Sequence, residues 1–277
     1  MVTMSTSVTS RTEGQERHFR RLVEDVARHG ADLALRTVEA DSKGWQWVLD
    51  HGDELKSAAA QVIVAKTREL ALRSSSQERA REIMGRNFFG AEEAAKHFAV
   101  NPSQAQFAAL REVPFSEETL MSCKDTHVLV AVFPLSILDI RAKVHAEPQR
   151  LFYDQSWYNK EKFAKDRGET GWHLIRKTSV DGSTSKTWDE QQFLLAADEE
   201  TPTARVVVYT IIGHFLATGE RLFERIYVRC SDVDSHGDRV YVGYFGEYGL
   251  SVNDDWDAYR RSYIGVASAR KSRILKS

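Results

Sequence analysis

The chain has 277 residues, of which 42% are hydrophobic and 28% are charged, a composition typical of globular proteins that bury a core. Its 38 lysines and arginines and 40 aspartates and glutamates give a formal net charge of −2, so no overall attraction to nucleic acid or to anionic membranes is expected. No apolar run approaches the roughly 18 residues of a membrane span, and the Ser/Thr-rich start lacks a secretory signal. We therefore expect a cytoplasmic protein without a transmembrane segment.

The first part of the chain is expected to be helical. Residues 1–12 are polar and aperiodic, which predicts a disordered tail. Apolar residues then recur at helical spacing over 15–40 and again over 42–72. Two such helices would form a hairpin, which we assign to residues 13–85, and its apolar face requires a partner. That partner is either the rest of the chain or, through homo-oligomerisation or docking, another molecule.

Residues 88–110 have the outline of a helix-turn-helix. A helix ending near Phe98, a turn with Pro102 and a second helix capped by Ser103 carry this pattern. A DNA-reading helix needs polar side chains for bases and flanking cations for phosphates, and the second helix offers two glutamines with Arg111 alone behind them. A packed helical pair is the favoured interpretation, and a DNA-binding regulator remains the alternative.

A buried strand is predicted at 126–133, where a nearly continuous apolar run is closed by Pro134. Ser116, followed by two glutamates, predicts the start of a short helix before it. We assign residues 86–150 to a small helical pair plus this strand, as part of the main domain or as a linker to it.

The main domain, residues 151–277, is expected to consist of short strands with few helices. The segments 171–175 and 222–229 alternate like strands, and the β-branched stretch 205–215 predicts a central strand. Residues 188–195 predict a short amphipathic helix.

Few residues are arranged for chemistry. Cys123 and Cys230 are too few for a disulfide framework and are expected to be buried thiols, and none of the nine histidines is paired at metal-ligand spacing. Residues 232–238 resemble the first half of a calcium loop, but Gly243 occupies the position of the required glutamate, so a calcium loop and a plain polar turn both remain open. We predict no catalytic residue, no metal and no cofactor.

The segment 241–263 is rich in tyrosine. It holds five of the nine tyrosines of the chain, and Tyr, Ser, Asn, Asp and Gly make up 14 of its 23 residues. The intervening apolar positions are spaced as if they point into a core: Val242, Phe245, Leu250, Val252 and Trp256. Tyrosine supplies rigid amphipathic contact area, and Ser, Asn and Gly supply adaptable hydrogen bonds, as in antibody paratopes. A ligand-binding surface and an ordinary polar loop are the two interpretations, and the density of tyrosine favours the first.

The end of the chain resembles the close of a C-type-lectin-type domain, in the form shared by formylglycine-generating enzymes and the variable proteins of diversity-generating retroelements. In that pattern an Arg-Val strand (here 239–243) enters a Gly-aromatic segment, a loop with Trp and Arg follows (256–260), and the last strand reads Gly-aliphatic-x-x-Ala-Arg (265–270). The segments 171–174 and 188–191 are similar to the start of such domains, without its proline. The resemblance covers residues 151–271 and implies a C-type-lectin-like mixed α/β domain with short antiparallel strands. Together with the helical periodicity of the N-terminal half, it predicts an α+β fold.

The two branches of this family differ in the residues that they require. The enzymes use two metal-binding cysteines close together near the end of the domain, where this chain has Cys230 alone. In the retroelement branch, adenine-rich codons are randomised, so that solvent-facing positions become Tyr, Asn, Asp, Ser and similar residues. The resemblance implies a diversified binding surface at Tyr241, Tyr244, Glu247, Tyr248, Ser251, Asn253, Asp254, Asp255, Ala258, Tyr259, Arg261, Ser262 and Tyr263. It implies a scaffold at Val242, Gly243, Phe245, Gly249, Leu250, Val252, Trp256, Arg260 and Gly265.

The function expected from these observations is non-enzymatic binding. The C-terminal surface would take a protein or other macromolecular ligand, without a cofactor, and the N-terminal helices could support a homo-oligomer. A DNA-binding regulator using residues 88–110 and an oxidase of the formylglycine-generating type are the alternatives.

Overall fold

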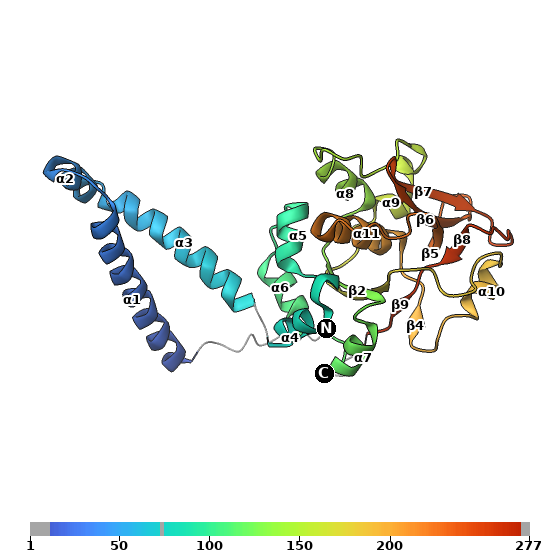
Figure 1. Cartoon of the computed structure of the whole chain (residues 1–277), viewed down its shortest axis with the longest axis horizontal. Helices are drawn as coiled ribbons and strands as arrows, with labels where there is room; N and C mark the ends of the chain where they lie inside the picture. The colour runs from blue at the N-terminus through green and yellow to red at the C-terminus, as the bar shows by residue number, and fades with distance from the viewer. Residues whose placement is uncertain (1–11, 73–74, 273–277) are drawn as a thin grey trace, which may run out of the picture. The chain divides into compact units, whose positions relative to one another are not determined.

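The chain forms two compact units in a computed structural model, which describes residues 12–72 and 75–272 (Figure 1). The first unit, Met1–Leu72, contains only helices among its described residues, and the second, Arg73–Ser277, contains helices and two sheets. The predicted α+β class is confirmed, because a helical N-terminal part precedes small sheets rich in antiparallel pairs. The predicted tail lies outside the described residues, except for Thr12.

Within residues 12–72, the first unit has three helices: α1 (Glu13–Thr37), α2 (Ser42–Asp50) and α3 (Gly52–Leu72). A capping box starts α1, since the Thr12 hydroxyl accepts the Gln15 N–H at 3.2 Å and the Gln15 side chain accepts the Thr12 N–H at 2.9 Å. The second helical stretch predicted from the sequence is divided at His51. No residue of α1 or α2 is buried, and most of their apolar side chains are exposed, whereas Val23 and Trp45 are half-buried.

The boundary between the units lies at residue 72 and not at residue 85 as predicted. The helix α4 (Ser75–Met84) belongs to the second unit because Ala80 and Met84 are buried in its core. The predicted segments 86–150 and 151–277 also form one unit, since a strand of the first pairs along its whole length with a strand of the second. Sequence periodicity identifies helices but does not show which body each helix joins.

The helical pair of the helix-turn-helix outline is present as α5 (Ala91–Phe98) and α6 (Gln104–Leu110), with Ser103 in the predicted cap. Phe98 and Leu110 are buried in the core, and Arg111 is exposed. The residues before this pair form the two-residue strand β1 (Phe88–Phe89). The pair therefore packs through its apolar residues, as the favoured interpretation requires.

The first sheet has the strand order β1-β2-β3-β9-β4. The predicted strands are confirmed as β2 (His127–Val132), which is buried throughout, and β3 (Gly171–Arg176), which pairs with it antiparallel. The other strands are β4 (Glu199–Glu200) and β9 (Ala269–Arg270). Around them lie α7 (Glu117–Cys123), capped by Ser116 as predicted, α8 (Ile137–Lys143), α9 (Lys162–Lys165) and α10 (Trp188–Gln192).

The predicted central strand at 205–215 is wrong, because this segment is the helix α11 (Ala204–Thr218). The Thr203 hydroxyl accepts the Val206 N–H at its start, and Gly219 ends it in the left-handed conformation with φ of 76°. All residues from Ala204 to His214 are buried, since the helix contacts β2, β5 and β6. A helix buried on all sides shows no amphipathic period, and its β-branched composition then imitates a buried strand.

The second sheet has the order β7-β6-β5-β8, and its strands β5 and β6 contact α11, as β2 does (Figure 1). Its strands are β5 (Tyr227–Val233), β6 (Arg239–Gly246), β7 (Gly249–Asp255) and β8 (Ile264–Val266). β5 thus starts five residues later than the predicted 222–229 strand. The inner face of the sheet is a continuous apolar layer of fully buried side chains: Val228, Cys230, Val240, Val242, Phe245, Leu250 and Val252.

Two histidines on adjacent strands make the fold sensitive to acid. Burial, together with Arg270, lowers the pKa of His127 to about 4, and burial, together with Arg205, lowers the pKa of His173 to about 4. In the unfolded chain both histidines titrate near 6.5. The unfolded state therefore binds more protons between pH 6.5 and 4, so stability is complete above this window and falls as the pH drops through it.

Within this window, we expect each histidine to lower the free energy of unfolding by up to about 1.4 kcal/mol for every unit by which the pH falls. Urea unfolding of the wild type and of a His127→Gln/His173→Gln variant across the window measures the effect. The double variant should show a clearly shallower slope, and equal slopes would mean that other groups dominate acid unfolding.

Candidate binding surface

The outer face of the second sheet carries four neighbouring tyrosines, Tyr227, Tyr241, Tyr244 and Tyr263, which we call the tyrosine cluster. Tyr227 is at its centre, with its ring centroid 4.8 Å from that of Tyr241, 4.6 Å from Tyr244 and 6.3 Å from Tyr263. Tyr227 and Tyr241 are half-buried, whereas Tyr244 and Tyr263 are exposed. The cluster is therefore a contiguous aromatic surface that solvent, and so a ligand, can reach.

Strand alternation places these rings on the outer face. Successive side chains of a strand point to opposite faces, so Tyr227 and Tyr241 point away from the core because Val228 and Val242 point into it. The half-buried position of Tyr241 affects its ionisation: burial, together with the nearby Asp255 carboxylate, raises its pKa. The phenol of Tyr241 consequently remains protonated and able to donate a hydrogen bond at neutral pH.

Tyr244 projects from an irregularity in β6. The register of β6 with β7 shifts between Gly243 and Gly246, and Tyr244 takes the left-handed conformation with φ of 48°. A residue other than glycine rarely adopts this conformation, and it is most common at turns and functional sites. The Tyr244 N–H donates to the Ile226 carbonyl at 3.1 Å, which fixes the backbone that carries the exposed ring.

Polar side chains extend the surface from the tyrosine cluster towards β7. The Asn253 side-chain amide donates to the Tyr227 hydroxyl at 3.3 Å and to the Ser251 hydroxyl at 2.9 Å. The Ser251 hydroxyl in turn donates to the Gln155 side chain at 3.4 Å. These contacts connect the rings to adaptable hydrogen-bonding groups, which is the composition of a paratope.

Arg229, whose side chain is fully buried, anchors the loop 256–263 on the side that faces the protein interior. Its guanidinium donates to the carbonyls of Trp256 at 3.1 Å and Tyr259 at 2.8 Å, and also to the Lys186 carbonyl and the Gln191 side chain at 3.2 and 3.3 Å. The rings of Trp256 and Tyr259 stack at 5.7 Å on the solvent side. The loop that ends at the tyrosine cluster is therefore fixed through its backbone.

Ion pairs also tie this loop to the sheet. Arg239 makes two hydrogen bonds to the Asp257 carboxylate, at 3.0 and 2.9 Å, and its guanidinium lies 3.9 Å from the centre of the Trp188 ring. Arg261 donates to the Asp255 carboxylate at 2.8 Å. A loop with this many contacts loses little conformational freedom when a ligand binds.

The predicted surface residues differ in their accessibility. One group is exposed: Tyr244, Glu247, Tyr248, Ala258, Tyr259, Ser262 and Tyr263. A second group is half-buried: Tyr241, Asn253, Asp254, Asp255 and Arg261. Ser251 is only 8% exposed, since it pairs with Gly243 inside the ladder, so it supports the surface from within. Glu247 and Tyr248 lie at the β6–β7 turn, beside the cluster along the chain.

The predicted scaffold residues are buried with two exceptions: Val242, Gly243, Phe245, Gly249, Leu250, Val252 and Gly265 lie in the interior. Trp256 is 60% exposed, so its expected inward orientation is wrong. It follows the end of β7, where strand alternation no longer determines direction. Arg260 is also exposed and pairs with Glu190 on α10 at 2.6 Å.

Two important residues of this surface were not among the predicted ones. Tyr227 is the centre of the tyrosine cluster and Arg229 anchors the loop, and both belong to β5. The alternation Tyr-Val-Arg-Cys over 227–230 would have indicated that both point to the outer face. The predicted strand 222–229 ends before Cys230, so it does not contain the whole pattern.

Three carboxylates lie close together at the end of the second sheet where β5 and β6 are connected. Asp234, Asp238 and Asp254 offer oxygen atoms within 4.8 Å of one another. The Asp234 carboxylate accepts backbone N–H groups of residues 236 and 238, both at 2.8 Å, while Asp232 of the calcium-like segment instead accepts the Ala204 N–H at the start of α11. These contacts are those of a polar turn, and we assign no metal to it.

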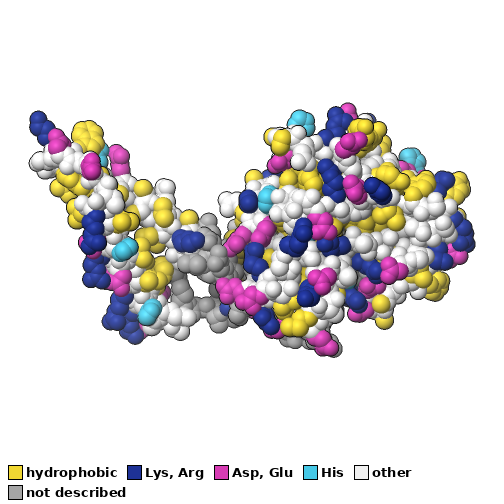
Figure 2. Space-filling view, in the orientation of Figure 1, with side chains coloured by type: hydrophobic (Ala, Val, Ile, Leu, Met, Phe, Trp, Pro, Cys, Tyr) yellow, Lys and Arg dark blue, Asp and Glu magenta, His cyan; other side chains and the backbone are white. Residues whose placement is uncertain are grey.

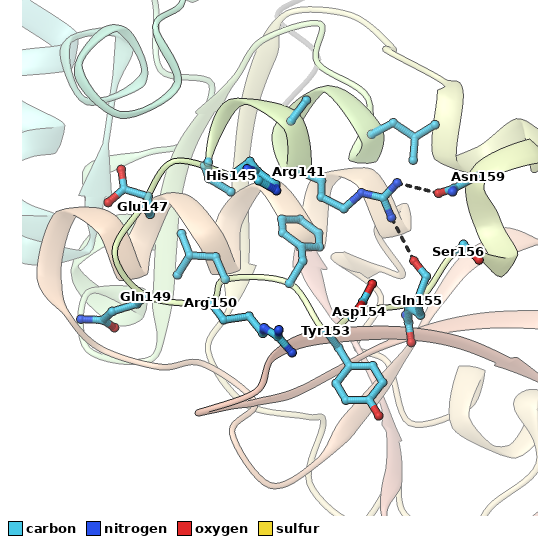
Figure 3. A pocket seen from close by; sticks show the side chains of 15 residues that line it. Arg141, His145, Glu147, Gln149, Arg150, Tyr153, Asp154, Gln155, Ser156 and Asn159 are labelled. Carbon is cyan, nitrogen blue, oxygen red and sulfur yellow. Dashed lines mark hydrogen bonds between the residues drawn. The ribbon is translucent and has the colours of Figure 1, made fainter.

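A hollow of about 860 Å³ adjoins the β7 edge of the sheet, between α8 and residues 149–156 (Figure 3). Arg141 crosses it and donates to the Gln155 carbonyl at 3.1 Å, the Tyr158 hydroxyl at 3.0 Å and the Asn159 side chain at 2.6 Å. The Gln155 side chain then donates to the Val252 carbonyl. The arginine therefore holds the segment that flanks β7, and its donors are directed at protein acceptors.

Both cysteines are buried, as expected for structural thiols. Burial raises the pKa of Cys230 well above its usual value. A thiol in this state is a poor nucleophile and a poor metal ligand, because both roles require the thiolate.

Comparisons of the chain with protein-family models, with curated proteins and with solved structures gave no match. Among the described residues, no helix combines the length and apolar character needed to cross a bilayer.

Proposed function

We propose that this chain is a non-enzymatic binding protein, which presents the outer face of its second sheet to a protein or other macromolecular ligand. The observation that carries the proposal is the tyrosine cluster itself: three rings that each contact the ring of Tyr227, with two of the four exposed, beside a loop anchored by the fully buried Arg229. Exposed, contiguous and rigidly held aromatic rings are the feature that binding surfaces share.

The chemistry of the surface favours this function. Each tyrosine ring buries a large apolar area against a ligand while its hydroxyl keeps a polar contact, and the ring has few rotatable bonds to immobilise. The neighbouring Asn253 and Asp255 add hydrogen-bonding groups at the rim. A surface fixed in advance binds more tightly for the same contacts, because little ordering is required on association.

We further propose that the second unit is a C-type-lectin-like variable protein of a diversity-generating retroelement. The supporting feature is the separation of residue types over 241–263, where, apart from the buried Ser251 and the exposed Trp256, the large apolar residues occupy the interior and Tyr, Asn, Asp and Ser lie towards solvent. Sequencing of the genomic locus tests this. A near-copy of the DNA for residues 241–263 beside a reverse transcriptase gene, differing chiefly at adenines, is expected, and a locus without such a copy would contradict it.

Binding is tested by selecting a random peptide-display library on the wild-type protein and measuring the selected peptides against variants. The triple variant Tyr244→Ala/Tyr248→Ala/Tyr263→Ala removes three exposed rings of the proposed surface. We expect most selected peptides to lose at least about tenfold in affinity, equivalent to about 1.4 kcal/mol.

The matched control removes three exposed apolar side chains elsewhere, in the variant Met121→Ala/Tyr153→Ala/Phe193→Ala. It should bind the selected peptides as the wild type does. Equal losses in both variants, or peptides that bind without the three tyrosines, would contradict the proposed location of the site.

A further inference from the structure

The helix α1 presents a seam of exposed apolar side chains. Phe19, Leu22, Val26 and Leu33 are between 39% and 54% exposed. Their spacing of three, four and seven residues is the a/d pattern of a heptad repeat, with His29 at the remaining position. Hydrophobic side chains on the surface of the first unit are visible in Figure 2.

This seam has no cover among the described residues of the first unit. No residue of α1 or α2 is buried, and on α3 the side chains of Leu55 and Val62 are 62% and 68% exposed. Helical stability in water comes mainly from packing of an apolar face, so a 25-residue helix with this face in solvent requires a partner.

The pattern indicates what kind of partner fits. A narrow seam with period 3.5 matches another helix with the same period, because each a/d side chain then inserts between four residues of the facing helix. Asp25 and Asp32 border the seam directly, beside Val26 and Leu33. Acidic residues at these positions oppose contact with an anionic membrane surface, where lysine and arginine would be expected.

The charges of α1 suit a second copy of the same helix. The helix carries five arginines and five acidic residues, so two copies do not repel each other. The half Glu13–Val23 has three arginines and two acids, and the half Glu24–Thr37 has two arginines and three acids. An antiparallel pair places the net positive half of one copy against the net negative half of the other, and the opposed helix dipoles favour the same orientation.

We infer that two copies of this chain associate through antiparallel pairing of α1 along the seam of Phe19, Leu22, Val26, His29 and Leu33. The inference is independent of the proposed ligand-binding function. It assigns the N-terminal unit the role of bringing two copies of the second unit together, which would allow two tyrosine clusters to bind one multivalent target.

The test is the mass of the full chain in solution. At about 10 μM, where a pair of micromolar affinity is largely assembled, light scattering should give twice the monomer mass of 31.5 kDa. The variant Leu22→Glu/Val26→Glu places two charges in the seam and should be a monomer at the same concentration. Its second unit should keep the thermal unfolding of the wild type.

The matched control is Ala27→Glu/Ala31→Glu, which adds two glutamates with the same spacing at exposed positions outside the seam. It should remain a dimer. A monomeric wild type, a mass of three or more copies, or a control that dissociates as far as the seam variant would overturn the inference.

Discussion

Arg229→Met is expected to lower the free energy of unfolding by about 3–5 kcal/mol, since the acceptors of four residues, all buried or partly buried, each lose the guanidinium as a donor. Methionine fills a similar volume but cannot donate a hydrogen bond. The carbonyls of Trp256 and Tyr259 lose their anchor, so the loop that leads to the tyrosine cluster should also exchange its amide hydrogens faster. Urea unfolding and hydrogen exchange measure the two effects.

Arg225→Met is the matched control, because Arg225 is exposed and lies four residues earlier. Its effect should stay within about 0.5 kcal/mol. Arg229→Lys retains the charge but not the fork of donors, so an intermediate loss is expected. If Arg229→Met is no more destabilising than the control, the loop is not held in the way described.

Gly243→Ala is expected to cost about 3 kcal/mol or more. Gly243 has φ of 152°, and a Cβ atom there would overlap the carbonyl oxygen of Ile226, the residue immediately before β5. Backbone strain accounts for about 1–3 kcal/mol, and separation of the strands adds to it. A loss of this size lowers the melting temperature of a unit of this length by about 6–12 °C.

Gly246→Ala provides the comparison within the same strand. A Cβ atom at Gly246 would meet no atom within 4 Å, and its φ is not in the left-handed region. This variant should melt close to the wild type. Equal melting temperatures for the two variants would mean that β6 does not approach β5 as closely as described.

The elements that could be predicted are those whose signals are local. Ser103 and Ser116 cap helices as their sequences indicate, because a cap depends on residues within one turn. The strand β2 was recognised from its unbroken apolar run, which pairing on both sides and burial on both faces require. Both kinds of signal are independent of the rest of the chain.

The errors concern features that depend on tertiary structure. α11 is rich in valine and isoleucine yet helical, because it contacts strands of both sheets, which requires apolar residues around the helix and so overrides β propensity. The exposure of Trp256 follows from the loop geometry set by Arg229, a residue 27 positions earlier. No local pattern contains that relation.

Sequence composition locates part of the candidate surface but not its centre. The segment 241–263 supplies Tyr241, Tyr244 and Tyr263, which composition alone singled out. Tyr227, which the other rings surround, comes from a strand that precedes that segment. Sequence composition finds a surface within one segment, whereas pairing of β5 with β6 and β8 is needed to assemble it.

The proposal that the tyrosines form a rigid binding surface is tested most directly with the Tyr244→Ala/Tyr248→Ala/Tyr263→Ala variant. Its free energy of unfolding and its affinity for the selected peptides are both measured. Rings that face solvent contribute little to folding, so stability should change by less than about 1 kcal/mol while affinity falls. A variant that unfolds readily would show instead that these phenol groups are part of the hydrophobic interior.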